Sequence, residues 1–158
     1  MDKYNILFLC SANSARSIIG EVLANTHISR KFVGYSAGAS TEPSLNPLAI
    51  EIAEDIGYPI ETLKSKHYSE FTSYESVKMD FIITVCDTSI FSIEPYWPGN
   101  PIIAQWRFTD PALVTGSIEV RRRAFNNIKI ELQRRLDILA SLPKSSLNFE
   151  QLQIMDFR

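Results

Sequence analysis

The sequence predicts a single-domain α/β fold in which a four-stranded parallel sheet has helices on both faces, a three-layer, Rossmann-like arrangement. Short apolar runs alternate along the 158 residues with segments of helical periodicity, and this alternation indicates parallel strands joined by right-handed crossovers. The runs are apolar almost throughout, as expected of strands that are buried on both faces. A chain of this length can also bury one sizeable core.

The positions of the elements follow from the same patterns. We predict strands at Ile6–Leu9, Lys31–Ser36, Asp80–Cys86 and Ile102–Trp106, and helices from Ile18 to about Asn25–Arg30, from Pro47 to Ile56 and at Ile118–Ser141. Asn46 is placed to cap the second helix and Gly57 to end it. Ala37–Ala39 is predicted to form a turn, and Ser69–Tyr74 a short helix.

We assign residues 1–143 to the domain and residues 144–158 to a C-terminal tail. The tail has four apolar side chains that could dock it on the surface, namely Leu147, Phe149, Leu152 and Phe157.

The segment Cys10–Ser17, with the sequence CSANSARS, joins the first strand to the first helix. A loop that leads into a helix has backbone N–H groups that no helical carbonyl reaches, and the helix dipole adds positive charge there. Such donors form a site for a tetrahedral oxyanion. We therefore expect the anion to be bound by Ser11, Ala12, Asn13, Ser14, Ala15, Arg16 and Ser17.

Cys10 stands at the mouth of this loop, where the same field favours the thiolate form of a cysteine, so it is a candidate nucleophile. Arg16 offers a planar fork that can hold two oxygens of an anion. Ser17 could donate a hydrogen bond to the sulfur, and Asn13 tolerates the left-handed backbone of a tight loop. The alternative is an inert buried thiol, which is common for a lone cysteine after an apolar strand.

Four residues with reactive or polar side chains lie at one edge of the predicted sheet. Cys10, Ser36, Cys86 and Asp110 all fall at or just past the carboxyl ends of strands. Ligands of open α/β sheets gather at this edge, so we expect one composite site there. Taken alone, Asp110 before Pro111 is typical of a turn, and Cys86 of a buried thiol. In a functional role Asp110 would act as a general acid.

Between its strand and its helix, CSANSARS resembles the phosphate loop of the low-molecular-weight protein tyrosine phosphatase superfamily. Its Asn-Ser-Ala-Arg-Ser portion is most similar to the arsenate reductases built on that fold. The resemblance extends to about Pro143 and implies a four-stranded parallel sheet with helices on both faces. It also implies a late Asp-Pro loop that completes the site, and Asp110-Pro111 has that place in the order of elements, so the resemblance favours Asp110 as the general acid.

The same resemblance implies a role for Cys86. Arsenate reductases of this fold use a cysteine after this strand to release arsenite, and Val85-Cys86-Asp87 matches their pattern. Some members carry a further cysteine a few residues on, which completes a relay reduced by thioredoxin. Here Ile93 has that position, and the chain contains only two cysteines. Turnover must therefore stop at a Cys10–Cys86 bridge or use an external thiol.

The implied activity is reduction of arsenate to arsenite, as in arsenic detoxification, through a thiol–arsenic adduct at Cys10. The implied partners are an arsenate or phosphate-type oxyanion and an external thiol donor, either glutathione with glutaredoxin or thioredoxin. Neither a metal nor an organic cofactor is expected.

Two other function classes stay open. A low-molecular-weight protein tyrosine phosphatase would hydrolyse phosphotyrosine through a phosphocysteine at Cys10. Against it, Ala112 and Leu113 follow the Asp-Pro pair, where the superfamily often has aromatic residues, and Ile18 stands where its phosphatases usually have proline. A non-catalytic oxyanion-binding domain is the third class, and the joint presence of Cys10, Arg16 and Asp110 argues against it.

Several remaining residues have a structural interpretation beside a functional one. Ser36 and Asn46 resemble residues that brace the loop through Asn13, or are ordinary turn and cap residues. Lys66 and His67 are predicted to lie on a solvated surface.

The arginines of the last helix, Arg121–Arg123 and Arg134–Arg135, are predicted to lie on its solvated face. Trp97 and Trp106 are predicted to pack in the core or at its rim.

The composition argues against other classes of partner. A net charge of −2 offers no electrostatic basis for binding nucleic acid or an acidic membrane. No apolar run approaches the roughly 20 residues of a membrane span. The first residues lead directly into a strand and leave no room for a signal peptide, and two cysteines suggest a reducing compartment. We therefore expect a cytoplasmic protein.

Overall fold

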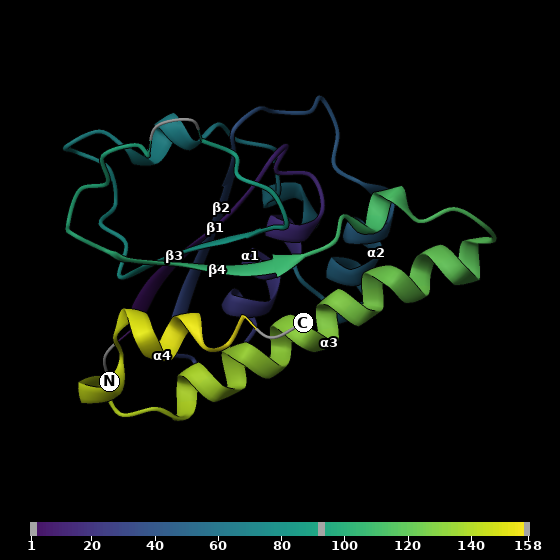
Figure 1. Cartoon of the computed structure of the whole chain (residues 1–158). Helices are drawn as coiled ribbons and strands as arrows, with labels where there is room; N and C mark the ends of the chain where they lie inside the picture. Colours follow the sequence, from purple (N-terminus) through teal and green to yellow (C-terminus); the bar gives the residue numbers. More distant parts are fainter. Residues whose placement is uncertain (1–2, 92–93, 157–158) are drawn as a thin grey trace.

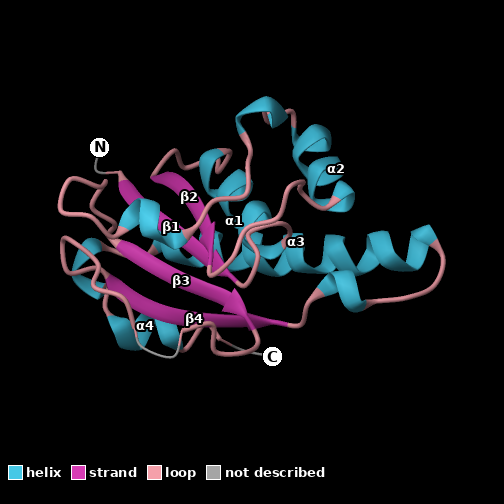
Figure 2. Cartoon of the chain, turned by 90° about the horizontal axis from the view of Figure 1, so that it is seen from above, coloured by secondary structure: helices cyan, strands magenta, loops and turns pink. Residues whose placement is uncertain are grey.

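The computed structural model describes residues 3–91 and 94–156. Four parallel strands form one sheet in the order β2-β1-β3-β4, which confirms the predicted sheet (Figures 1 and 2). The strands are β1 (Tyr4–Cys10), β2 (Phe32–Gly38), β3 (Phe81–Cys86) and β4 (Ile102–Phe108). Because β1 and β3 are neighbours and run in the same direction, Cys10 and Cys86 lie at the same end of the sheet.

Four α-helices and four short 3-10 helices occur in the described part of the chain. They are α1 (Arg16–Asn25), α2 (Pro47–Ile56), α3 (Ile118–Ser141), α4 (Phe149–Gln153), η1 (Ile60–Thr62), η2 (Tyr68–Phe71), η3 (Pro111–Leu113) and η4 (Lys144–Ser146). The Asn46 side chain caps α2 by accepting a hydrogen bond from the N–H of Leu48, and Gly57 ends it with a φ of 87°. Within the described residues, no helix combines the length and the apolar character needed to cross a bilayer.

The two faces of the sheet are covered differently. Ile6 and Phe8 point to one face and pack into a core cluster to which all four α-helices contribute. Leu7 and Leu9 point to the other face and pack with Trp97 and with η2 in a smaller cluster. The helix expected on this second face is therefore a single 3-10 helix, which is accompanied by loops (Figure 1). The connection from β3 to β4 contains three prolines, Pro95, Pro98 and Pro101, which disfavour a longer helix there.

The predicted turn at Ala37–Ala39 is wrong, because β2 continues through Gly38. Gly38 pairs with Cys10 of β1, and its N–H donates to the carbonyl of Lys66 at 2.8 Å. A Cβ atom at Gly38 would come within 2.8 Å of the Asn13 nitrogen, so this close approach requires glycine. The short helix expected at Ser69–Tyr74 is η2, which begins and ends earlier.

The prediction for the arginines of α3 is wrong for Arg135. Its side chain is almost fully buried, and the guanidinium donates to the Met155 carbonyl at 2.7 Å and lies over the ring of Phe108. Burial lowers the pKa of Arg135, an effect that the carboxylate of Glu131 opposes. Trp106 is fully buried in the core, as predicted.

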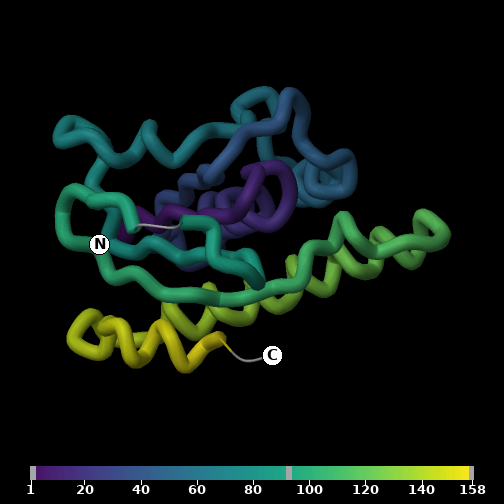
Figure 3. Tube along the Cα trace, turned by 45° about the horizontal axis from the view of Figure 1, so that its top comes forward, coloured from purple at the N-terminus to yellow at the C-terminus, as the bar shows by residue number. Residues whose placement is uncertain are grey.

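The segment after Pro143 lies along β4, which is an edge strand of the sheet (Figures 1 and 3). The side-chain amide of Gln153 accepts from the N–H of Gln105 and donates to its carbonyl, both at 3.0 Å, as a neighbouring strand would do. Asp156 accepts from the N–H of Arg107 and pairs with its guanidinium. Leu152 is fully buried in the main core. The segment therefore satisfies edge groups that would otherwise be open to pairing. Phe157 lies outside the described residues.

We predict that Leu152→Ala lowers the free energy of unfolding by about 3 kcal/mol, because truncation of a fully buried leucine leaves a cavity. Urea unfolding followed by circular dichroism measures this value. Ile154→Ala is the matched control, since Ile154 is 68% exposed in the same segment, and it should change stability by no more than about 0.5 kcal/mol. Equal effects of the two variants would contradict a structural role for the segment.

Candidate active site

The loop between β1 and α1 turns its carbonyl groups outward, where other segments bind them. The Ser11 carbonyl accepts from the N–H of Ser40 at 2.9 Å, the Ala12 carbonyl from the Ser65 hydroxyl at 2.8 Å, and the Ser14 carbonyl from the N–H of Asn46 at 3.0 Å.

In a trans peptide the N–H of the next residue points away from the carbonyl, so the following N–H groups face the inside of the loop. That of Asn13 confirms this orientation, because it donates to the Cys10 sulfur at 3.3 Å. Asn13 has a φ of 52°, the left-handed value anticipated from its residue type. At the end of the loop, α1 begins without a side-chain cap. This geometry is compatible with the oxyanion site predicted for the loop, and the binding of an anion there stays a prediction.

The loop encloses a cavity of about 50 Å³. It is lined by Cys10, Ser11, Ala12, Ser14, Ala15, Arg16, Asp110 and Ala112. Pockets for organic ligands are typically several times larger, so this space suits a small inorganic anion. A larger cavity, of about 260 Å³, lies at the opposite end of the sheet near Tyr4 and Asp80, away from both cysteines. The cavity near Cys10 is therefore the better candidate for chemistry.

Cys10 is buried, and its sulfur accepts a hydrogen bond from the backbone N–H of Asn13. The Ser17 hydroxyl lies 2.9 Å from the sulfur, where the sequence predicts a hydrogen bond. Asn13 and Ser17 were expected among the anion-binding residues, but they do not line the cavity. Both are fully buried, and the Asn13 amide donates to the Ser17 hydroxyl at 2.8 Å. Their contacts are with the nucleophile rather than with the space for the anion.

Arg16 is held at the cavity by groups from the ends of β3 and β4. Its guanidinium donates to the Phe108 carbonyl at 2.8 Å and to the Asp87 carboxylate at 3.4 Å, and it lies 3.8 Å from the Asp110 carboxylate. Asp110 in turn accepts from the N–H of Ala112 at 2.9 Å, which fixes its side chain on the cavity wall. Sequence reasoning did not assign a role to Asp87, although its position after Cys86 places it at the carboxyl edge of the sheet.

Cys86 is buried and free of any disulfide. Its thiol donates to the Thr88 carbonyl at 3.3 Å. Burial raises the pKa of the Cys86 thiol, and the negative charge of Cys10 acts in the same direction, whereas Arg16 opposes both. Cys86 does not line the cavity, and Ile93 lies outside the described residues. The structure thus places a second buried, free thiol at the same end of the sheet as Cys10.

Ser36 and Asn46 were expected to brace the loop through Asn13, but their hydrogen bonds are with other residues. The backbone N–H of Asn46 binds the Ser14 carbonyl, and Ser36 donates to the Glu21 carboxylate at 2.6 Å. The direct partner of Asn13 is Lys66, whose N–H donates to the amide oxygen at 2.7 Å.

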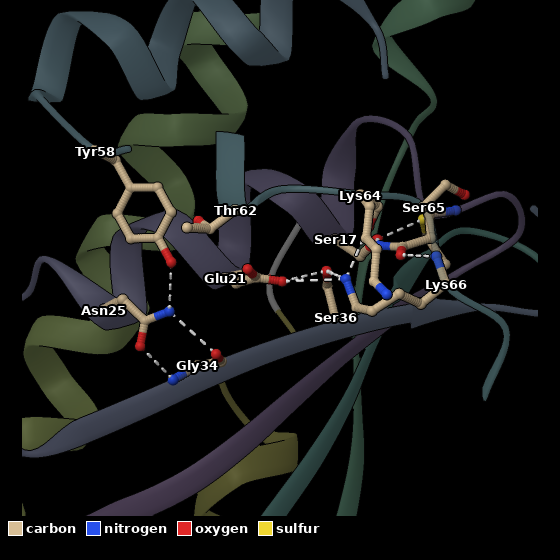
Figure 4. A network of polar contacts seen from close by, with 12 residues as sticks. Ser17, Glu21, Asn25, Gly34, Ser36, Tyr58, Thr62, Lys64, Ser65 and Lys66 are labelled. Carbon is tan, nitrogen blue, oxygen red and sulfur yellow. Dashed lines mark hydrogen bonds and ion pairs between the residues drawn. The ribbon is translucent and has the colours of Figure 1, made fainter. Parts of the chain in front are cut away.

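The prediction of a solvated Lys66 is wrong. Its ammonium group lies 3.6 Å from the Glu21 carboxylate, and both side chains are largely buried (Figure 4). Within residues 3–91 and 94–156, no group of three or more His, Cys, Asp or Glu side chains is arranged to hold a metal ion.

Comparisons with known proteins agree with this geometry. Residues 5–142 match the family of low molecular weight phosphotyrosine protein phosphatases. An arsenate reductase of Halalkalibacterium halodurans is 30% identical over 145 residues, which cover 91% of this chain and 100% of that protein. An arsenate reductase of Bacillus subtilis is 28% identical over the same length, with the same coverage.

Solved structures show the same relationship. An arsenate reductase in a phosphate-binding state superposes with a TM-score of 0.67 at 26% identity and covers 89% of this chain and 98% of its own. A low molecular weight phosphotyrosine phosphatase of Vibrio cholerae O395 superposes with a TM-score of 0.66 at 16% identity, over 91% of this chain and 99% of its own, and shows the fold alone. With its sheet order and the match over residues 5–142, this chain belongs to the low molecular weight phosphotyrosine protein phosphatase family.

Proposed function

We propose that the protein is an arsenate reductase that forms a thiol–arsenic adduct at Cys10. The observation that carries the proposal is a buried sulfur that is hydrogen-bonded to the Asn13 N–H and the Ser17 hydroxyl and that lines an anion-sized cavity together with Arg16 and Asp110. The similarity to arsenate reductases over nine-tenths of the chain supports this choice of reaction within the family.

In the first step, arsenate occupies the loop of residues 11–16 and the Cys10 thiolate attacks arsenic. A sulfur–arsenic bond forms and an arsenic–oxygen bond breaks. Asp110 supplies a proton to the departing oxygen, which leaves as water. The inward N–H groups and Arg16 stabilise the charge on the remaining oxygens, and such preorganised donors usually supply the largest catalytic contribution.

In the second step, another thiol attacks the Cys10 sulfur. A disulfide forms, the electron pair of the sulfur–arsenic bond stays on arsenic, and arsenite leaves as As(III) while two thiols are oxidised. We assign this role to Cys86, because it is free and ends β3, the parallel neighbour of the strand that ends at Cys10.

An external thiol donor, either thioredoxin or glutathione with glutaredoxin, then reduces the Cys10–Cys86 disulfide. Because each cycle begins with both thiols reduced, the proposed setting is a reducing, cytoplasmic compartment.

Phosphotyrosine hydrolysis is the second candidate, since it uses the same nucleophile, arginine and acid. No aromatic side chain is among the described residues that line the cavity, and Leu113 beyond the Asp-Pro pair is 74% exposed. A phosphotyrosine ring needs apolar or aromatic walls to hold it. The lining of the cavity at Cys10 therefore supports a small oxyanion as substrate.

We predict that the wild-type protein produces arsenite with at least one of the two thiol donors, and that Cys10→Ser lowers this rate by at least about 10³-fold, because a hydroxyl is a far weaker nucleophile than a thiolate. Arsenite release is measured beside hydrolysis of an aryl phosphate by the same samples. Fast aryl phosphate hydrolysis without arsenite under either donor would instead identify a phosphatase. Unchanged activity of Cys10→Ser would contradict both the reductase and the phosphatase mechanism, because each requires Cys10 as nucleophile, and it would favour a non-catalytic oxyanion-binding domain.

We also predict that the fully reduced wild-type protein, without any donor, releases one arsenite per chain, and that Cys86→Ser releases much less until a small thiol is added. Since burial raises the pKa of Cys86, the fraction of its reactive thiolate grows with pH, and release from the wild type should accelerate between about pH 7 and pH 9. Rapid-quench arsenite assays measure both effects. Stoichiometric release from Cys86→Ser without added thiol would exclude Cys86 as the second thiol.

A further inference from the structure

The hydrogen bond between Ser17 and Cys10 has two possible directions, and only one of them favours a thiolate. If the hydroxyl donates to the sulfur, it stabilises the negative charge. If instead the thiol donates to the hydroxyl, the protonated form is stabilised. The distance of 2.9 Å is compatible with either direction. What decides the direction is the other partner of the Ser17 hydroxyl.

That partner is the side-chain amide of Asn13, and a backbone group determines its orientation. The N–H of Lys66 can only donate, so the atom of Asn13 that it meets at 2.7 Å must be the amide oxygen. The NH₂ group of Asn13 therefore faces Ser17, and it donates to the hydroxyl at 2.8 Å. Among the described residues, the one other hydrogen-bond partner of this hydroxyl is the Cys10 sulfur, so the hydroxyl hydrogen satisfies its own bond by donating to that sulfur. The N–H of Lys66 thus sets the direction of a relay that ends at the nucleophile.

Lys66 is held in this position at both its backbone and its side chain. Its carbonyl accepts from the N–H of Gly38 at the end of β2. Its ammonium group lies 3.6 Å from the Glu21 carboxylate on α1, 3.4 Å from the Ser36 hydroxyl, and donates to the Lys64 carbonyl at 2.8 Å (Figure 4).

The Lys66 and Glu21 side chains are only 12% and 10% exposed, so neither charge can be removed without leaving the other buried and poorly compensated. Loss of one charge would therefore displace the segment that carries the Lys66 N–H.

We propose that Lys66 is a positioning residue for the Cys10 nucleophile. Its buried ion pair with Glu21 keeps its backbone N–H on Asn13, and this contact orients the Asn13 amide so that it donates to the Ser17 hydroxyl, which in turn donates to the Cys10 sulfur. The inference rests on the role of Cys10 in the proposed function, but it does not depend on which oxyanion is the substrate.

The test measures the rate at which iodoacetamide alkylates Cys10, in a Cys86→Ser background so that one thiol reports. Lys66→Met should slow alkylation about tenfold near pH 7, where the rate depends on how well the relay supports the thiolate. Near pH 9.5 the rate should stay close to that of the parent, because a thiolate then forms without that support. Lys64→Met is the matched control, since this neighbouring lysine is exposed, and it should leave both rates unchanged.

Glu21→Gln provides an independent variant, because it removes the charge that holds Lys66 and leaves the relay residues intact. It should also slow alkylation mainly near pH 7. Because coupled residues act as a unit, the double variant Glu21→Gln/Lys66→Met should be alkylated no more slowly than the slower of the two single variants.

Three outcomes would overturn the proposal: an unchanged rate in Lys66→Met, multiplied losses in the double variant, or rates that change equally at both pH values, as an unfolded site would show. Because alkylation needs no arsenate, this proposal can hold even if the protein produces no arsenite. Equally, the protein can prove to be an arsenate reductase even if Lys66 does not position Cys10.

Discussion

The orientation of the peptide groups between Cys10 and Arg16 is the constraint on which the rest of the site depends. The N–H groups can face a bound anion only if the carbonyls face outward, and hydrogen-bond donors from other segments hold the carbonyls in that direction. Three separate segments supply these donors, through Ser40, Asn46 and Ser65. The end of β2, the cap of α2 and the loop before η2 therefore support the site, although the cavity itself is lined by the loop and by Asp110 and Ala112.

Charge is balanced on both sides of this loop by different means. On the cavity side, Arg16 is held by a carbonyl and two carboxylates at the ends of β3 and β4, which keeps its positive charge at the place where an oxyanion would bind. On the far side, the Lys66–Glu21 pair is buried and contacts the nucleophile only through Asn13 and Ser17. The first group of charges faces the substrate space, whereas the second supports the scaffold of the sulfur.

The local pattern was sufficient for much of the fold and for part of the site. Apolar runs predicted all four strands, and helical spacing predicted α3 with its observed bounds. A strand buried on both faces is apolar at every position, whereas a helix buried along one face has apolar residues three or four positions apart, so the two patterns can be told apart in a sequence. The order strand, CSANSARS, helix predicted the contact between Ser17 and Cys10, whereas the binding of an oxyanion by this loop stays a prediction. The local pattern did not predict that the Arg135 and Lys66 side chains are buried. Their charged groups contact residues 20 or more positions away in the sequence.

By itself, the sequence determined where the strands run, where the loop with its cysteine lies, and which end of the sheet carries the reactive groups, because these features depend on neighbouring residues and on the direction of parallel strands. Only the tertiary structure decided which partners bind the loop carbonyls, that Asp87 shares Arg16 with Asp110, and that Lys66 orients Asn13. Hydrogen bonds and ion pairs between distant segments depend on how the chain packs, and residue type and spacing carry no direct record of that.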